Sequence, residues 1–460
     1  MTKWREAWME ALHIDSQRGR LAWLGNFEVE QDWRSKDVIG LPGVPSVTQA
    51  PLALSELALL LAAPEDLVLL PSEPDDSFLS YLLSLGWRSP AIFAPESKSL
   101  SSNESLTCQL LAATSSGAPS AVRRWAEAGD GFLLPHGVSV WEEALAEDWH
   151  IPLAAPRTSV TREVNSKLFS RELCEQLGIP QVPGRTVRTL SELESAFAEL
   201  APHLAEGPLV LKEGMGVSGK GMLRIDSAAK FQQVLRMLRQ SAVRQGTEHT
   251  EFVLEQWIDN AQDLNVQFLV SRDGQVRQVT ILTALVQNGT HLGHMSPHQL
   301  TASAEERVRA YAEQIGQALH AHGYYGLVGL DAMIGRDGKL YPCIEINARL
   351  NMSTYHTRLL QDWAPAGKHA LIRPFSFSKQ APLAFVQIQQ ALQAKLYRVD
   401  SGHGVILCAY APVNSSDPHG RRGKLYTTMI GDSAEECLQL ERFCRQQLQQ
   451  IGGIGLKVDV

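Results

Sequence analysis

The sequence has 460 residues, more than one hydrophobic core usually organises, and it therefore predicts two or three domains. Hydrophobic residues make up 44% and charged residues 20%, a balance typical of soluble globular proteins. The formal net charge of -8 and the lack of a long basic run argue against a nucleic-acid-binding platform, which needs concentrated Lys and Arg.

The sequence also predicts a cytoplasmic location. No stretch approaches the ~20 apolar residues that span a bilayer. Residues 1–8 carry three charged side chains and lack the apolar core of a signal peptide. The six cysteines are scattered and none forms a Cys-x-x-Cys pair, so neither a disulfide framework nor a zinc site is expected.

The first third of the chain is expected to be a domain of its own. Eight of the ten tryptophans lie before residue 150. Residues 66–70 have the pattern of a buried strand, residues 78–85 that of a helix, and residues 132–135 that of a strand end. Alternation of this kind predicts an α/β layer structure.

Helices alternate with strand pairs in the rest of the chain. Helices are expected over about 165–178, 189–200, 226–238 and 303–323, with Asn165, Thr189, Asp226 and Ser303 as N-caps. Runs 266–270 and 276–280, and runs 327–334 and 340–347, flank Asp-Gly turns and predict two hairpins. The last segment, about 380–460, has a strand near 405–411 and a helix near 434–449.

Residues 209–221, Leu-Val-Leu-Lys-Glu-Gly-Met-Gly-Val-Ser-Gly-Lys-Gly, join a short β run to a loop with four glycines. Glycines let backbone N–H groups approach an anion, and Lys212 and Lys220 would add charge for phosphate groups. The Walker spacing GxxxxGK[ST] is absent. The alternative is a flexible hairpin tip on the surface.

Residues 252–258, Phe-Val-Leu-Glu-Gln-Trp-Ile, have the pattern of a strand that runs into a polar break. The edge of such a strand offers backbone donors and acceptors to the rim of an adenine, and the carboxylate of Asp263 just beyond could bind ribose hydroxyls. The alternative is a plain core strand.

The strongest constellation pairs Asp331, inside the run Gly-Leu-Asp-Ala-Met-Ile, with Glu345 and Asn347 in the run Tyr-Pro-Cys-Ile-Glu-Ile-Asn-Ala-Arg. Charges embedded in apolar strands are rarely buried unless they are paired or bind a metal. Mg²⁺ takes hard oxygen ligands, typically one or two carboxylates with substrate phosphates. The alternative is two independent surface carboxylates.

The hairpin register sets a condition for this metal site. With a two-residue turn at Asp337-Gly338, Asp331 would pair with Ile344 and Glu345 would point to the opposite face. An odd-length loop or a bulge restores the alignment. The metal-site hypothesis therefore predicts an irregular hairpin.

These pieces, in this order, resemble the ATP-grasp superfamily over residues 160–360, above all in the Glu-Ile-Asn-x-Arg string that ends at Arg349. The resemblance implies that Lys167 and Lys212 contact ATP phosphates, that Ser218 and Gly219 belong to the phosphate-covering loop, and that Arg349 steadies an acyl-phosphate. It further implies an adenine hinge of Glu255, Gln256, Trp257 and Ile258, a ribose contact at Asp263, and a Mg²⁺ site of Asp331, Glu345 and Asn347. Arg349 and Lys212 are the expected catalytic residues.

Two positions depart from the family pattern. Glu213 stands where many members have proline, and residues 350–353 differ from the glycine-containing versions of that loop.

His294, in a loop of residues 291–297, could face the substrate or be an ordinary hydrogen-bonded residue, and His403 is equally ambiguous.

The front end is similar to the pre-ATP-grasp domain of pheganomycin-type peptide ligases, carried by Leu-Leu-Pro-His at 133–136 and Asn-Ser-Lys at 165–167. The implied fold class is α/β (α+β), with a pre-ATP-grasp domain at 1–155 and an ATP-grasp domain at 156–375. The latter has a small lid lobe at about 184–255 and antiparallel sheets. Residues 376–460 would complete the catalytic lobe.

The implied activity is a carboxylate–amine ligase that uses ATP with Mg²⁺, or with Mn²⁺ instead, and releases ADP and phosphate. The expected partners are a small carboxylate and an amine, with amino acids or peptides among the candidates. Neither nucleic acid nor a membrane is expected, and a homodimer is left open. The alternatives are a small-molecule kinase on the same scaffold and a non-catalytic nucleotide-binding protein.

Overall fold

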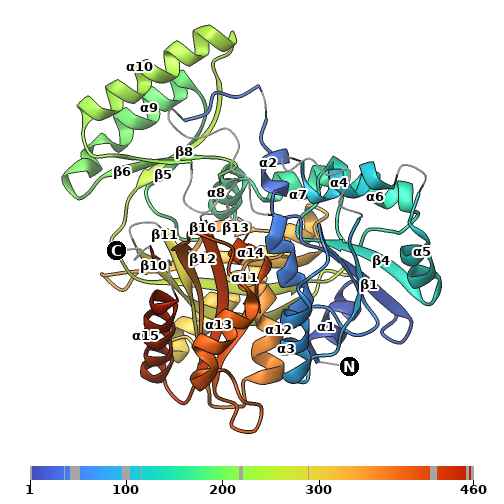
Figure 1. Cartoon of the computed structure of the whole chain (residues 1–460). Helices are drawn as coiled ribbons and strands as arrows, with labels where there is room; N and C mark the ends of the chain where they lie inside the picture. The colour runs from blue at the N-terminus through green and yellow to red at the C-terminus, as the bar shows by residue number, and fades with distance from the viewer. Residues whose placement is uncertain are drawn as a thin grey trace.

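The chain folds into three connected parts around two antiparallel sheets and one parallel sheet. The computed structural model describes residues 3–35, 37–41, 52–95, 104–114, 117–216, 221–287, 290–414, 422–451 and 455–456. Figure 1 shows the N-terminal part in blue to teal, a green lobe that projects from the rest, and a large sheet of yellow to red strands. Among the described helices, none is both long and apolar enough to cross a bilayer.

The N-terminal part is built on a parallel sheet in the order β3-β2-β1-β4. Its central strand is buried almost throughout, as expected when helices cover both faces of a parallel sheet. The strands are β1 (Gly19–Leu24), β2 (Leu67–Leu69), β3 (Ala91–Phe93) and β4 (Asp130–Pro135). The helices are α1 (Lys3–Ala11), α2 (Val29–Asp32), the 3₁₀ helix η1 (Leu52–Leu60), α3 (Asp76–Ser84), α4 (Leu106–Ala113), α5 (Ser120–Glu127) and α6 (Val140–Trp149). The expected α/β layer structure is confirmed.

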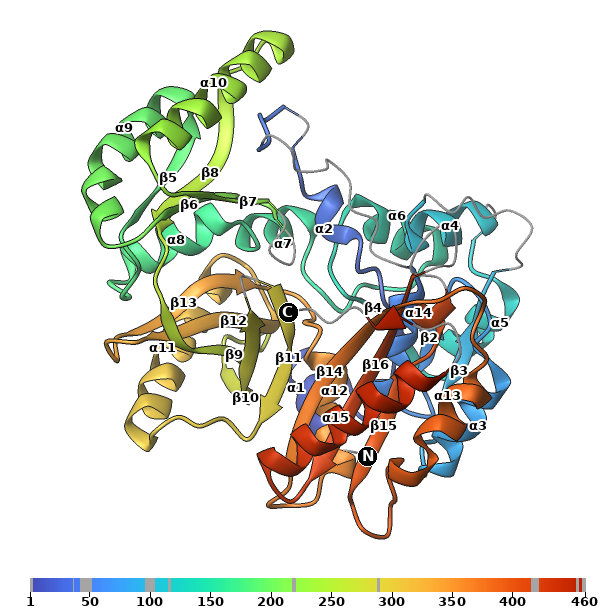
Figure 2. The ribbon, with the colours of Figure 1, turned by 60° about the vertical axis from the view of Figure 1, so that its left-hand side comes forward.

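The green lobe has an antiparallel sheet in the order β5-β8-β6-β7, with its two long helices lying together on one side (Figures 1 and 2). The strands are β5 (Gly184–Thr189), β6 (Leu209–Glu213), β7 (Met222–Ile225) and β8 (His249–Gln256), and the helices are α9 (Leu190–Leu200), η3 (Ala201–Ala205) and α10 (Ala228–Gln245). Phe197 and Phe231 stack at the centre of this core, with ring centroids 3.7 Å apart.

The large sheet runs β13-β12-β9-β10-β11-β14-β16-β15, and β17 pairs with β14. Its strands are β9 (Asn260–Val270), β10 (Val276–Gln287), β11 (Thr290–Ser296), β12 (Gly326–Gly335), β13 (Leu340–Asn347), β14 (His369–Ser378), β15 (Gly404–Ala409), β16 (Arg422–Gly431) and β17 (Gly455–Leu456). The helices of this region are α7 (Thr158–Val164), α8 (Lys167–Gln176), α11 (Ala302–Ala321), α12 (Thr354–Trp363), α13 (Phe385–Leu392), η4 (Gln393–Lys395), α14 (Ala411–Asn414) and α15 (Ala434–Gln450). Because β14 runs across residue 375, the C-terminal segment and the ATP-grasp-like strands share one sheet.

The two faces of β9 have different roles. Leu264, Val266 and Phe268 belong to the core that includes α11. The alternate residues point to the opposite face, because side chains along a strand alternate. There, Gln267 donates to the hydroxyl of Ser353 (2.7 Å) and accepts from Thr354 (2.9 Å), at the start of α12. The polar face of β9 is thus directed toward the residues that follow Arg349.

The predicted N-caps of three helices are wrong by one or two residues. Ser166, Ser227 and Thr301 cap α8, α10 and α11 through their hydroxyls, in place of Asn165, Asp226 and Ser303. Each true cap has an extended backbone, which lets its side chain reach the free N–H groups of the first turn. Several small polar residues stand at each boundary, and the pattern alone does not select among them.

Glu56 joins the N-terminal part to the C-terminal strands. Its carboxylate accepts hydrogen bonds from the backbone N–H groups of Tyr410 and Ala411, the latter at 2.7 Å. The residue is 2% exposed, and burial raises the pKa of its carboxyl to about 7.

This buried carboxyl should make stability depend on pH. The unfolded chain titrates Glu56 near 4.5, so between about pH 4.5 and 7 the folded state binds the extra proton and the unfolding free energy falls as pH rises. The ionised group then costs at most about 3.5 kcal/mol, at about 1.4 kcal/mol for each pKa unit. Glu56→Gln should raise the Tm at pH 8 and change it much less at pH 5, as thermal unfolding at both pH values would show. A lower Tm at pH 8 would contradict the assignment.

Candidate active site

The β12–β13 hairpin brings Asp331 and Glu345 directly opposite each other. The two residues pair across the strands, whereas nearer the turn Met333 pairs with Tyr341, so the register shifts by a bulge. The bulge includes Pro342, which cannot donate to the ladder. The predicted irregular hairpin is therefore confirmed, and both side chains point to the same face of the sheet.

Amide groups surround the two carboxylates. Asn265 of β9 pairs with Asp331 and donates to its Oδ1 (3.3 Å), and Asn347 donates to its Oδ2 (3.2 Å). Lys167, at the start of α8, donates from Nζ to Glu345 Oε1 (2.7 Å). The pKa of Asp331 is raised to about 6, first by burial and then by the negative charge of Glu345. A like-charge pair of this kind favours an incoming cation.

These residues fit a hard divalent cation. In the part of the chain that the structure describes, no cluster of three or more His, Cys, Asp or Glu residues could hold a metal by itself. Mg²⁺, however, is commonly held by one or two carboxylates and completed by substrate phosphates and water. Two facing carboxylates with the amide oxygen of Asn347 beside them match that chemistry.

Arg349 lies in a bend two residues beyond the end of β13 and contacts three other residues. Its Nη2 donates to Asn347 Oδ1 (2.8 Å), its Nη1 donates to the carbonyl of Leu350 (3.1 Å), and Nη2 also pairs with Glu30 of α2. Asn351, which lies in the loop that departs from the family pattern, donates to the carbonyl of Arg349 (2.9 Å). A Cβ at Gly329 would come within 2.4 Å of Asn351, so glycine is needed there for this packing.

A small cavity lies between the green lobe and β13, lined by Lys167, Ser170, Arg171, Gln181, Val182, Lys212, Val253, Glu255, Cys343 and Ile344. Inside it Glu255 forms ion pairs with Lys212 (2.5 Å) and with Arg171 (3.2 Å). Three cationic side chains, Lys167, Arg171 and Lys212, thus line this cavity. The single carboxylate of Glu255 pairs with two of them. The cavity is therefore suited to a polyanion.

The other predicted nucleotide residues are placed differently. Among the predicted hinge residues, Glu255 is the one that lines the cavity, whereas the backbone N–H groups of Gln256 and Trp257 donate to the carbonyls of Pro183 and Pro208 (2.8 Å each). Asp263 lies two residues before Asn265 on β9 and so on the same face as Asp331. Ile258 follows the end of β8 and is half-buried. Ser218 and Gly219 lie outside the described residues.

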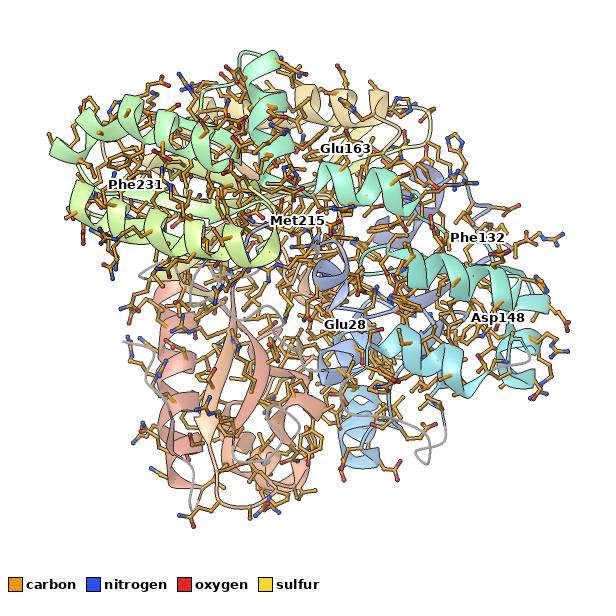
Figure 3. All side chains as sticks on the ribbon, turned by 90° about the horizontal axis from the view of Figure 1, so that it is seen from above. Glu28, Phe132, Asp148, Glu163, Met215 and Phe231 are labelled. Carbon is orange, nitrogen blue, oxygen red and sulfur yellow. The ribbon has the colours of Figure 1, made fainter. Side chains whose placement is uncertain are left out.

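A segment of the N-terminal part, residues 29–35 and 37–41, reaches across to the green lobe. Arg34 pairs with Glu213 and donates from Nε to the carbonyl of Met215 (3.0 Å), and the backbone N–H of Leu41 donates to Glu213 Oε1 (2.8 Å). Figure 3 shows Met215 at the inner end of the lobe, toward the segment that carries Glu28. Glu213, where many family members have proline, therefore anchors the base of the glycine loop to the N-terminal part.

Some site residues were missed in the sequence analysis, although the sequence carries a signal for three of them. Asn265 and Gln267 are polar residues at alternate positions of an apolar strand, and Arg171 lies four residues after Lys167 on α8 and so on the same helix face. Glu30 and Arg34 left none, because their partners are more than 170 residues away in the sequence.

His294 and His403, whose roles the sequence left open, both lie close to other side chains. His294 lies in β11 rather than in a loop, is 5% exposed, and its Nε2 lies 3.2 Å from that of His291. His403 lies beside Glu436, with its Nε2 2.8 Å from the Oε1 of that carboxylate.

Two family models match the chain in sequence order. A model described as a pre ATP-grasp domain matches residues 55–151, and one described as L-aspartate–L-methionine ligase, ATP grasp, matches residues 183–347. The expected pre-ATP-grasp and ATP-grasp parts are therefore confirmed. The narrower resemblance to pheganomycin-type ligases stays a prediction.

Relatives and solved structures agree with this result. The [butirosin acyl-carrier protein]–L-glutamate ligase of Niallia circulans is 24% identical over 375 residues, which cover 81% of this chain and 82% of that one. The fold is similar to an ADP complex of N5-carboxyaminoimidazole ribonucleotide synthetase (TM-score 0.54, 16% identity, 93% of this chain and 96% of the other). It is also similar to Campylobacter jejuni biotin carboxylase in a β,γ-ATP complex (TM-score 0.56, 16% identity, 88% and 90%). The expected fold class is confirmed, and the chain is similar in sequence and fold to ATP-grasp ligases.

Proposed function

We propose that the chain binds Mg²⁺-ATP between the green lobe and the β12–β13 hairpin, converts a substrate carboxylate to an acyl-phosphate and joins it to an amine. The observation that carries this proposal is the facing pair Asp331 and Glu345, linked through Lys167 to the cation-lined cavity. Carboxylates for a metal and lysines for phosphates, side by side, are what phosphoryl transfer requires of a protein.

In the first step the substrate carboxylate attacks the γ-phosphate of ATP and releases ADP. Lys167 and Lys212 exchange Glu345 and Glu255 for phosphate oxygens, because a polyanion competes for the same ammonium groups. Mg²⁺, held by Asp331, Glu345 and Asn347, would neutralise the phosphate oxygens when bound. Most of the acceleration in such a site comes from charge and positioning.

The remaining ATP contacts are proposed from the family resemblance. Glu255, Gln256, Trp257 and Ile258 form the adenine hinge, and Asp263 binds the ribose. Ser218 and Gly219 cover the phosphates. In the second step an amine attacks the acyl carbon while Arg349 steadies the acyl-phosphate oxygens.

We infer that at least one substrate is an amino acid or a small peptide. Support comes from the names of the similar proteins, since one family model concerns an L-aspartate–L-methionine ligase and one relative is a ligase for L-glutamate. The charged groups around Arg349 and Glu30 suit a small zwitterionic molecule.

Other features of the proposal await their own tests. The domain boundaries of 1–155, 156–375 and 376–460, the use of Mn²⁺ in place of Mg²⁺, a homodimer and a cytoplasmic location stay predictions.

A substrate panel tests the proposed function. The purified chain is incubated with Mg²⁺-ATP and pairs drawn from the twenty amino acids and small carboxylic acids, and phosphate release and product mass are measured. We expect at least one pair to raise phosphate release and to give the mass of an amide. A phosphorylated product without an amide would instead indicate a kinase, and no amide mass with any pair would contradict the proposal.

A further inference from the structure

The N-terminal part contributes a carboxylate to the catalytic centre. Glu30 lies on α2, a helix of four residues, and pairs with Nη2 of Arg349. The side chains of Glu30 and Arg349 are 13% and 14% exposed, so both groups are largely withdrawn from water.

Glu30 also feels the charges of the proposed metal and phosphate residues. Burial raises the pKa of its carboxyl, the cations Arg349 and Lys167 lower it, and the anion Glu345 raises it again. Glu30 therefore lies within electrostatic reach of the groups that would surround the reacting atoms.

The segment that carries Glu30 is held in place by other contacts. Glu28 accepts from the backbone N–H of Leu106 (2.7 Å), and the indole N–H of Trp33 donates to the carbonyl of Val138 (2.8 Å). Arg34 is fixed to the green lobe, as described above. Glu30 is thus not required to anchor its own segment.

A count of charges indicates what Glu30 could do. Glu30, Asp331 and Glu345 face Lys167 and Arg349 in this centre. In the proposed reaction a divalent cation would neutralise Asp331 and Glu345. Phosphate oxygens would replace the carboxylates as the partners of Lys167 and Arg349. Glu30 is then a buried carboxylate that has lost its partner, which is costly unless another cation arrives. The substrate that remains to bind is an amine, which is protonated near neutral pH.

We propose, on the basis of the function proposed above, that Glu30 binds the ammonium group of the attacking substrate and takes its proton. The N–H bond breaks and the proton passes to the Glu30 carboxylate, which later releases it to water. The freed nitrogen lone pair forms the C–N bond as the C–O bond to phosphate breaks. The second amine proton leaves with the phosphate as hydrogen phosphate, so the charges and atoms balance.

Hydroxylamine separates this role from a structural one. It is largely uncharged near neutral pH and attacks acyl-phosphates without prior loss of a proton, so it reports formation of the intermediate alone. Wild type, Glu30→Gln and Glu30→Asp are assayed with Mg²⁺-ATP and a mixture of the twenty amino acids, with and without hydroxylamine, and hydroxamates and amides are measured by mass spectrometry. Glu10→Gln is the matched control, because it breaks an exposed ion pair between α1 and Arg277 of β10.

We expect Glu30→Gln to lower amide formation about 100-fold or more, the usual contribution of an acid–base group, while hydroxamate formation stays within about threefold of wild type. Glu30→Asp should recover part of the amide rate, and Glu10→Gln should change neither product. An equal loss of amide and hydroxamate, or an unchanged amide rate, would overturn the role of Glu30. Wild-type chain that forms neither hydroxamate nor amide would instead overturn the proposed function, and the role of Glu30 with it.

Discussion

Asp331→Asn should slow ATP turnover by about a thousandfold or more. The substitution keeps the size of the side chain and its place opposite Glu345, but removes one of the two carboxylates proposed to hold Mg²⁺. A metal ion at a transferring phosphoryl group is worth several kcal/mol, and about 4 kcal/mol corresponds to about a thousandfold in rate. Phosphate release with the substrate pair found in the panel measures the effect.

The same substitution should not lower the stability of the folded protein. Between about pH 4 and 6 the metal-free wild type binds an extra proton at Asp331, so its unfolding free energy falls as pH rises through that window. Asparagine removes this cost, and the Tm of the metal-free variant at pH 8 should equal or exceed that of wild type. Asp337→Asn, in the turn of the same hairpin, is the control and should keep its activity. Normal turnover by Asp331→Asn would contradict the metal assignment.

The local chemistry of the hairpin could be predicted from the sequence because it depends on residues close together. Asp331, Glu345 and Asn347 lie within 17 residues of one another on two strands joined by a short turn, and the strand period fixes which of them share a face. Even the irregularity could be stated in advance, since an acid on each strand can meet only if the register shifts.

The contacts that join distant parts could not be predicted in this way. The pairings of Glu30 with Arg349 and of Arg34 with Glu213 depend on how the N-terminal part packs against the two other parts, and neither periodicity nor capping carries that information. Glu213 illustrates the limit. The sequence shows that this residue is unusual for the family. The structure alone shows why, because its carboxylate binds the backbone N–H of Leu41 and the guanidinium of Arg34.

Arg349→Lys should lower amide formation by about 100- to 1000-fold, even though it keeps the positive charge. Arg349 donates at once to Asn347 and to the carbonyl of Leu350 while it pairs with Glu30. A lysine ammonium is a point charge and cannot reproduce this planar fork. Loss of one positioned donor to a developing oxyanion typically costs about 10²- to 10³-fold in rate.

Arg349 and Glu30 form one ion pair, but substitutions of the two residues should impair different parts of the reaction. Arg349→Lys should reduce hydroxamate and amide together, because the acyl-phosphate itself is poorly held, whereas Glu30→Gln should reduce the amide alone. ATP affinity, measured by nucleotide titration, should change less than about threefold in Arg349→Lys, since Arg349 does not line the cavity between the green lobe and β13. Arg336→Lys, in the turn of the same hairpin, is the matched control. An Arg349→Lys chain that forms hydroxamate at the wild-type rate would contradict the proposal that the guanidinium holds the acyl-phosphate.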